Sequence, residues 1–144
     1  MELEDAVNDQ IQRHCAKGDD SAKQALYPDA LKEYWAAWDL LPEPKTQWEA
    51  ATWILAAVGD ANYLSGDFVA GRDNLSHAMH CPDAIGNPFL HLRLGQCQFE
   101  VGNLDRAADE LGTLSFTRPR ERGVRCHFQN CHFFFGTLIP SARV

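Results

Sequence analysis

The sequence of 144 residues lacks any apolar run that approaches the ~18 residues a membrane-spanning helix requires, and its longest run extends only from Trp53 to Val58. The first five residues, Met1 to Asp5, are acidic and contain no apolar segment of the kind found in secretory signals. Five cysteines, an odd number at irregular spacing, do not make the framework of a disulfide-rich secreted domain. We therefore expect a cytoplasmic protein with reduced thiols and no membrane partner.

Motifs of catalysis and cofactor binding are also missing. The sequence contains neither of the glycine-rich phosphate-binding patterns, G-x-G-x-x-G and G-x-x-x-x-G-K-[ST], and it has no H-E-x-x-H metal-binding pattern. Cys97 and His91 are six residues apart, which places them on different faces of one helix rather than side by side as a nucleophile and its base. We expect no enzymatic activity and no cofactor.

Cysteine and histidine do gather in one place, the run from Cys126 to His132. The two cysteines and two histidines of this run are interleaved, whereas zinc sites usually take their ligands from separate pairs. One short segment would also have to surround the ion alone. We expect no metal site, and the alternative that the composition leaves open is a structural zinc in this run.

The charge is acidic overall and unevenly distributed. Thirteen Lys and Arg against 20 Asp and Glu give a formal net charge of −7, which disfavours nucleic acid as a partner. Residues 1–111 carry −11, whereas residues 112–144 carry +4 and contain no lysine. Beyond this point the sequence is also enriched in Cys, His and Phe. We predict one domain at residues 1–115 and an atypical basic tail, rich in Cys, His and Phe, at residues 116–144.

An internal repeat organises the first part of the chain. Shifted by 36 residues, the segment 58–68 lies over the segment 94–104, with apolar residues, an aromatic residue and two glycines in register. Gly59 and its counterpart in the second segment fall within predicted helices, where glycine is unfavourable unless another helix approaches closely. Gly66 and its counterpart are placed at predicted helix ends, where positive φ is needed. The pattern predicts two helices joined by a tight turn.

Cap residues mark the ends of further predicted helices. Thr46 followed by Glu49 predicts a capping box, and Asn87 before Pro88 predicts an N-cap followed by a proline in the first helical position. Apolar residues spaced by three and four predict a helix at residues 29–41. The described signals are all helical, so the sequence predicts an all-α fold.

These segments resemble the tetratricopeptide repeat, a helix–turn–helix unit of 34 residues. Residues 58–63 and 94–99 are similar to its first-helix signature, and its second-helix signature is matched by Ala30, Tyr34, Ala37 and Pro42. The resemblance implies an all-α, tetratricopeptide-like helix–turn–helix solenoid of about three repeats, at residues 5–42, 46–82 and 87–115, with an irregular C-terminal tail.

In this family the first helices line a concave groove, and the resemblance implies which residues contact a partner there. The implied set joins aromatic, acidic and amide side chains, a composition typical of binding hot spots: Trp53, Asp60, Tyr63, Leu64, Phe89, Gln96, Phe99 and Glu100. A chaperone tail peptide is not expected, because Ala56 and Leu92 stand where the family's carboxylate clamp has lysines. The alternative left open is that the rings fill the core between repeats.

The acidic body predicts a basic protein partner, because opposite charge steers two proteins together. The segments 40–53 and 86–96 are similar to small bacterial repeat proteins found with polymorphic toxin loci, where such proteins act as immunity proteins. The resemblance implies a protein that binds and neutralises a cognate toxin domain. The alternative is a scaffold or secretion adaptor that holds a peptide in the same groove. The sequence gives no basis for predicting whether the protein is a monomer or an oligomer.

Overall fold

The computed structural model describes residues 3–114, which form helices and no strand. The six α-helices and one short 3-10 helix are α1 (Asp5–Lys23), α2 (Tyr27–Asp39), η1 (Lys45–Gln47), α3 (Glu49–Leu64), α4 (Phe68–Ala78), α5 (Pro88–Glu100) and α6 (Leu104–Thr113). The predicted all-α class is therefore confirmed for this part of the chain. The predicted tail at residues 116–144 lies outside the described residues.

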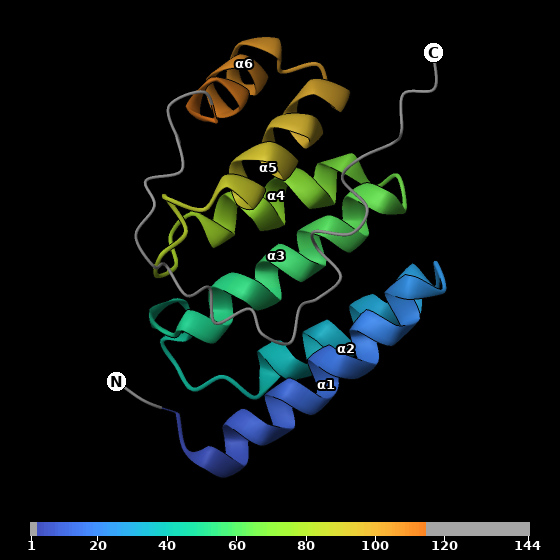
Figure 1. The fold of residues 1–144 in the computed structure, drawn as a ribbon, viewed down its shortest axis with the longest axis vertical. Coiled ribbons are helices and arrows are strands. Elements are labelled where there is room, and N and C mark those ends of the chain that lie inside the picture. Colours follow the sequence, from blue (N-terminus) through green and yellow to red (C-terminus); the bar gives the residue numbers. More distant parts are fainter. Residues whose placement is uncertain (1–2, 115–144) are drawn as a thin grey trace.

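The helices pair into three antiparallel hairpins, α1 with α2, α3 with α4, and α5 with α6, which stack along the long axis of the molecule (Figure 1). The second helix of each of the first two hairpins packs against the first helix of the next. All three hairpin turns lie along one edge, and the two longer connections lie along the opposite edge (Figure 1). Each hairpin therefore contacts only its neighbours in the stack.

Each hairpin is closed by a glycine of its first helix. A Cβ placed on Gly18 would lie 2.5 Å from Tyr34 Cε1, and one placed on Gly95 would lie 2.8 Å from Leu111 Cγ. A Cβ on Gly59 would overlap the Leu75 side chain in the same way. The predicted close approach of a second helix is confirmed. In all three hairpins the glycine and the large residue are 16 positions apart, so the hairpins are structurally equivalent.

The three hairpin turns share one backbone conformation. Gly66 and Gly102 have φ of +86°, as predicted for helix ends, and Ala25 takes the same place in the first hairpin with φ of +58°. After each turn an amide donates to a carbonyl five residues earlier, and the three donor–acceptor pairs are Leu26 to Ser21 at 2.9 Å, Asp67 to Asn62 at 2.9 Å and Asn103 to Gln98 at 2.8 Å. This bond satisfies a carbonyl that the end of the helix would otherwise leave unpaired.

Of the three predicted helix starts, one is confirmed, one lies two residues from the observed start, and one is wrong. The Asn87 side chain accepts from the Phe89 amide at 3.0 Å, and α5 begins at Pro88 as predicted. The helix predicted at residues 29–41 is α2, which begins two residues earlier and also ends earlier. The capping box is wrong, because Thr46 lies in η1 and Trp48, with no side-chain cap bond, precedes α3. The 3-10 turn separates Thr46 from the helix it was expected to cap.

The core runs through the middle hairpin. Its largest fully buried side chains include Ile11, Ile54, Leu55, Leu75 and Leu90, contributed by α1, α3, α4 and α5. Each stabilises the fold by about 1.5–3 kcal/mol relative to an exposed position. Eleven of the 16 residues of α3 are buried, against one of the 10 residues of α6. The first hairpin and the third therefore cover α3 from both sides.

No helix within residues 3–114 is both long enough and apolar enough to cross a lipid bilayer.

Candidate functional site

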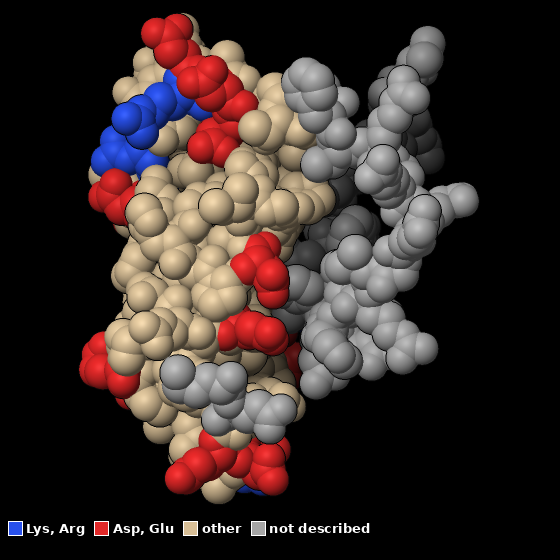
Figure 2. Space-filling model, turned by 90° about the vertical axis from the view of Figure 1, so that its left-hand side faces the viewer, with Lys and Arg blue, Asp and Glu red and all other residues tan. Residues whose placement is uncertain are grey.

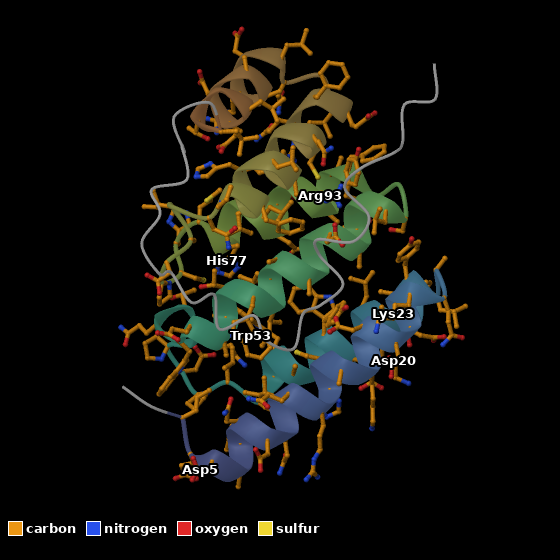
Figure 3. The ribbon with its side chains drawn as sticks, in the orientation of Figure 1. Asp5, Asp20, Lys23, Trp53, His77 and Arg93 are labelled. Atoms are coloured by element: carbon orange, nitrogen blue, oxygen red, sulfur yellow. The ribbon has the colours of Figure 1, made fainter. Side chains whose placement is uncertain are left out.

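The eight residues predicted to contact a partner lie on α3 and α5, the first helices of the second and third hairpins. Three of them, Trp53, Tyr63 and Phe89, are partly buried and pack against the core. Figure 3 shows Trp53 in the N-terminal half of α3 and Arg93 on α5 near the opposite end of α3. These three rings therefore contribute to packing as well as to the surface, as the alternative interpretation of the sequence expected.

Arg93 of α5 lies at the centre of the predicted set, although the sequence analysis did not include it. Its guanidinium carbon is 4.5 Å from the centroid of the Tyr63 ring and 5.6 Å from that of the Phe89 ring. An arginine held over aromatic rings in this way gains a cation–π attraction, worth ~2 kcal/mol when water is excluded. The Arg93 side chain is only 12% exposed, so this attraction is close to its upper range.

The same guanidinium contacts two polar residues of the predicted set, Asp60 and Gln96. Nη2 of Arg93 lies 2.5 Å from Oδ1 of Asp60, whose side chain is 16% exposed. Nη1 donates to Oε1 of Gln96 at 2.9 Å. Burial raises the pKa of the Asp60 carboxyl, and the Arg93 guanidinium opposes this rise without cancelling it. The Asp60 carboxylate is therefore neutralised inside the molecule by Arg93.

The remaining three predicted residues, Leu64, Phe99 and Glu100, are exposed at the helix ends next to the hairpin turns. Phe99 is 59% exposed and Leu64 is 44% exposed. The Glu100 carboxylate makes no ion pair among the residues that the structure describes. These three side chains are the part of the predicted set that is available to a partner.

The sequence feature that could have identified Arg93 is its position as a basic residue within an apolar segment of a predicted helix. Arg93 stands between Leu92 and Leu94 and is one of only eight Lys and Arg in residues 1–111. The equivalent position of α3, 36 residues earlier, is Ala57, so the comparison of the two segments gave no reason to select it. Its partners come from two helices, which a pattern within one helix does not reveal.

One histidine–glutamate pair joins the two helices of the first hairpin, and an equivalent pair joins the two helices of the third hairpin. Nδ1 of His14 lies 2.7 Å from Oε2 of Glu33, and Nδ1 of His91 lies 2.6 Å from Oε2 of Glu110. Both pairs are separated by 19 residues, so they are equivalent. Nε2 of His91 also lies 2.6 Å from the Ile85 carbonyl oxygen. With an acceptor at each nitrogen, the doubly protonated ring fits this site best.

The pKa of His91 agrees with this geometry. Burial lowers it, but the hydrogen bonds to the Ile85 carbonyl and the Glu110 carboxylate outweigh burial and raise the pKa above the ordinary value. These histidines therefore fix the two helices of a hairpin to each other. Their engagement within the fold gives no indication of a catalytic base.

Side chains suited to metal binding or thiol chemistry are not brought together within residues 3–114. Within residues 3–114, no three His, Cys, Asp or Glu side chains are placed to hold a metal ion together, and the run from Cys126 to His132 lies outside that range. Burial raises the pKa of the Cys97 thiol to about 11, so it is a poor nucleophile at neutral pH. The His77 ring, labelled in Figure 3, packs against the Trp38 ring with centroids 5.7 Å apart.

Two clefts of the described residues are lined by other side chains than those of the predicted set. One, of about 370 Å³, is lined by Leu3, Glu4, Val7, Pro42 and Trp48 at the start of α1. Another, of about 420 Å³, lies at the turn between α5 and α6 and is lined by Gly102, Asn103, Leu104, Asp105 and Arg106. Neither contains a residue of the predicted set.

The surface charge follows the acidic composition. Figure 2 shows the face that carries the longer connections, where acidic side chains are scattered along the molecule and basic ones gather mainly near the α6 end. Residues 3–114 contain 8 Lys and Arg against 18 Asp and Glu.

No protein-family model, no curated protein and no solved structure matches this chain.

Proposed function

We propose that this chain is a protein-binding module of the tetratricopeptide-repeat type, in which the first helices of three hairpins present a surface to a partner. The equivalence of the three hairpins supports the repeat assignment, because the same glycine contact and the same turn recur in each. The observation that carries the binding function is the exposure of Leu64 at the end of α3 and of Phe99 at the end of α5, where Glu100 has no ion pair within residues 3–114. Apolar anchors with a polar rim are typical of protein interfaces.

The sign of the charge supports a basic partner. The described part of the chain carries a net charge of −10, and its few basic residues include Arg93, whose guanidinium is already paired. A concentrated acidic surface raises the association rate with a basic protein and makes that rate fall with salt. The proposed partner is therefore a basic protein or a basic segment of one.

In its most specific form, the proposal is that the chain binds and neutralises a cognate toxin domain. This form rests on the resemblance of the segments 40–53 and 86–96 to small bacterial repeat proteins of toxin loci. A scaffold or secretion adaptor would use the same surface, and the two functions differ only in what happens to the partner after binding.

The partner itself provides the test. The full chain is immobilised, proteins from the source organism are passed over it, and a captured protein is eluted with salt and identified. The captured protein is then expressed alone and together with the chain. If it stops growth alone and not in the pair, the chain is an immunity protein. A captured protein that is harmless alone identifies a scaffold or adaptor, and binding that persists unchanged in Phe99→Ala and Leu64→Ala variants contradicts the proposed surface.

A further inference from the structure

The contact between the second and third hairpins is made by a helix that presents an arginine. Arg93 of α5 lies over the Tyr63 ring at the end of α3. The Tyr63 ring also packs against Phe68, the first residue of α4, with ring centroids 5.5 Å apart. The end of α3 and the start of α4 therefore form a receiving surface of two aromatic rings for an arginine-bearing helix.

An equivalent receiving surface lies at the far end of the stack. Counting 36 residues along the chain, Tyr63 corresponds to Phe99 and Phe68 corresponds to Leu104. The first pair is half-buried, because the third hairpin covers it. The second pair is exposed, Phe99 by 59% and Leu104 by 60%, and no helix of residues 3–114 packs against it. The cleft of about 420 Å³ at the α5–α6 turn adjoins Leu104 and leaves room beside it.

The acidic side chains at this open end also favour a positively charged partner. In the inner contact, Asp60 neutralises the incoming arginine. The residue that corresponds to Asp60 in the third hairpin is Gln96, which already accepts from Arg93. The adjacent Glu100 is exposed and has no ion pair within the described residues. Asp105 and Asp109 are further exposed carboxylates on α6, beside the exposed Arg106, so carboxylates outnumber the arginine around the apolar centre at this end.

We propose that Phe99, Leu104 and Glu100 form a docking surface for an amphipathic helix of a basic partner protein, and that this helix presents an arginine one turn after an aromatic residue. In α5 the arrangement is provided by Phe89 and Arg93, which are four residues apart. The inference rests on the proposed protein-binding function and specifies the element of the partner that is recognised.

A second copy of this chain does not present that pattern at its own free end. The positions of α1 that correspond to Phe89 and Arg93 are Gln12 and Ala16, which lack both the ring and the charge. Stacking of α1 of one molecule on α6 of another would therefore leave the Phe99 ring without a cation. A foreign helix is the occupant that the charges favour.

The probe for this surface is a synthetic peptide of residues 87–101, capped at both ends, which copies the helix that the inner contact already accepts. Position 97 is changed to alanine in the peptide, because the residue that would face it is Ala107 where the inner contact has Gly71. A Cβ on Gly71 would lie 2.9 Å from the Cys97 sulfur, and removing the sulfur relieves this overlap. A lactam bridge, formed between a glutamate and a lysine introduced at positions 88 and 92 of the peptide, keeps it helical, which circular dichroism verifies.

Binding of the labelled peptide to the full chain is measured by fluorescence anisotropy. We expect saturable binding that is at least about fivefold weaker when position 93 of the peptide is glutamine, because the cation–π attraction is lost. In the full chain, Phe99→Ala should weaken binding about tenfold or more, and Glu100→Gln should weaken it at low salt. Leu26→Ala, an exposed apolar residue at the first hairpin turn, is the matched control and should bind like the unchanged chain.

Three results would overturn the inference. They are the absence of saturable binding up to about 1 mM peptide, equal binding by the Phe99→Ala variant, and self-association of the chain that Phe99→Ala abolishes. The last would identify a second copy as the occupant. Failure here leaves the proposed function standing if a captured protein still binds the chain, whereas failure to capture any protein while the peptide binds contradicts the broader proposal alone.

Discussion

Replacing Arg93 should reveal how strongly the second and third hairpins are joined. Arg93→Met keeps most of the apolar stem but removes the charge from between the Tyr63 and Phe89 rings, which costs ~1–2 kcal/mol in cation–π attraction. It also leaves Asp60 buried without its cation, which costs ~3–5 kcal/mol when the partner of a fully buried pair is removed. Protonation of Asp60 limits that cost, because its pKa is already raised.

We therefore expect the free energy of unfolding to fall by ~2–4 kcal/mol in Arg93→Met. Urea denaturation followed by circular dichroism measures this change. Asp60→Asn leaves the Arg93 guanidinium without its anion and should also destabilise the protein, although the Tyr63 and Phe89 rings still attract the cation. The double variant should be less destabilised than the sum of the two single variants, by ~1–3 kcal/mol. Arg106→Met, which removes an exposed arginine of α6, is the matched control and should change stability by less than ~0.5 kcal/mol.

The same variant should depend on pH in a defined direction. Asp60 has a raised pKa in the folded state, so its contribution to stability is present below the unfolded pKa and is lost as the pH rises through the folded pKa. The deficit of Arg93→Met should therefore be smaller in acid than at neutral pH. If Arg93→Met behaves like Arg106→Met, or if the double variant shows no coupling, Arg93 does not join the hairpins as described.

Three further outcomes are expected. Gly59→Ala should destabilise the protein by ~1–3 kcal/mol, because the added methyl overlaps a leucine of α4. The control Gly112→Ala has open space around the added methyl and should be neutral or slightly stabilising. Equal thermal midpoints of the two variants would contradict the helix contact. His91 should stabilise the fold when protonated, so the free energy of unfolding of the unchanged chain should decline as the pH rises above 6.5 through the raised pKa of His91. In His91→Gln the free energy of unfolding should depend less on pH. Parallel pH curves of the two proteins would argue against the paired imidazolium. Cys97 should react with iodoacetamide slowly at pH 8, since a pKa of about 11 leaves only ~0.1% thiolate, and rapid alkylation of the native chain, located by peptide mapping, would show that the thiol is accessible.

The helical class and the two closely matching hairpins were predictable because they follow from local patterns. Glycines at 36-residue spacing and turn residues report on contacts within about one hairpin. The first hairpin was harder to align, because its glycine precedes Gly59 by 41 residues rather than 36. Two differences in helix length account for the five extra residues. The part of α2 that follows Tyr34 is two residues longer than the part of α4 that follows Leu75, and the part of α3 that precedes its glycine is three residues longer than the corresponding part of α5.

The site was predicted less completely than the fold. Exposure of Phe99 and Glu100 agrees with their expected role, but the pairing of Asp60 with Arg93 was not foreseen. That pair joins residues 33 positions apart on different hairpins, and no periodicity within one helix encodes it. The Thr46 capping box failed for a similar reason, because packing of Trp48 and its bond to the Pro42 carbonyl set the start of α3 instead.

The enclosure of α3 has a consequence for how the molecule opens. With 11 of its 16 residues buried, α3 becomes exposed to solvent only after a flanking hairpin has detached. The amide hydrogens of α3 should therefore exchange with deuterium last, and those of α6 among the first. Fraying would begin at the termini and proceed inward, so the protein would shed its outer hairpins before losing its centre.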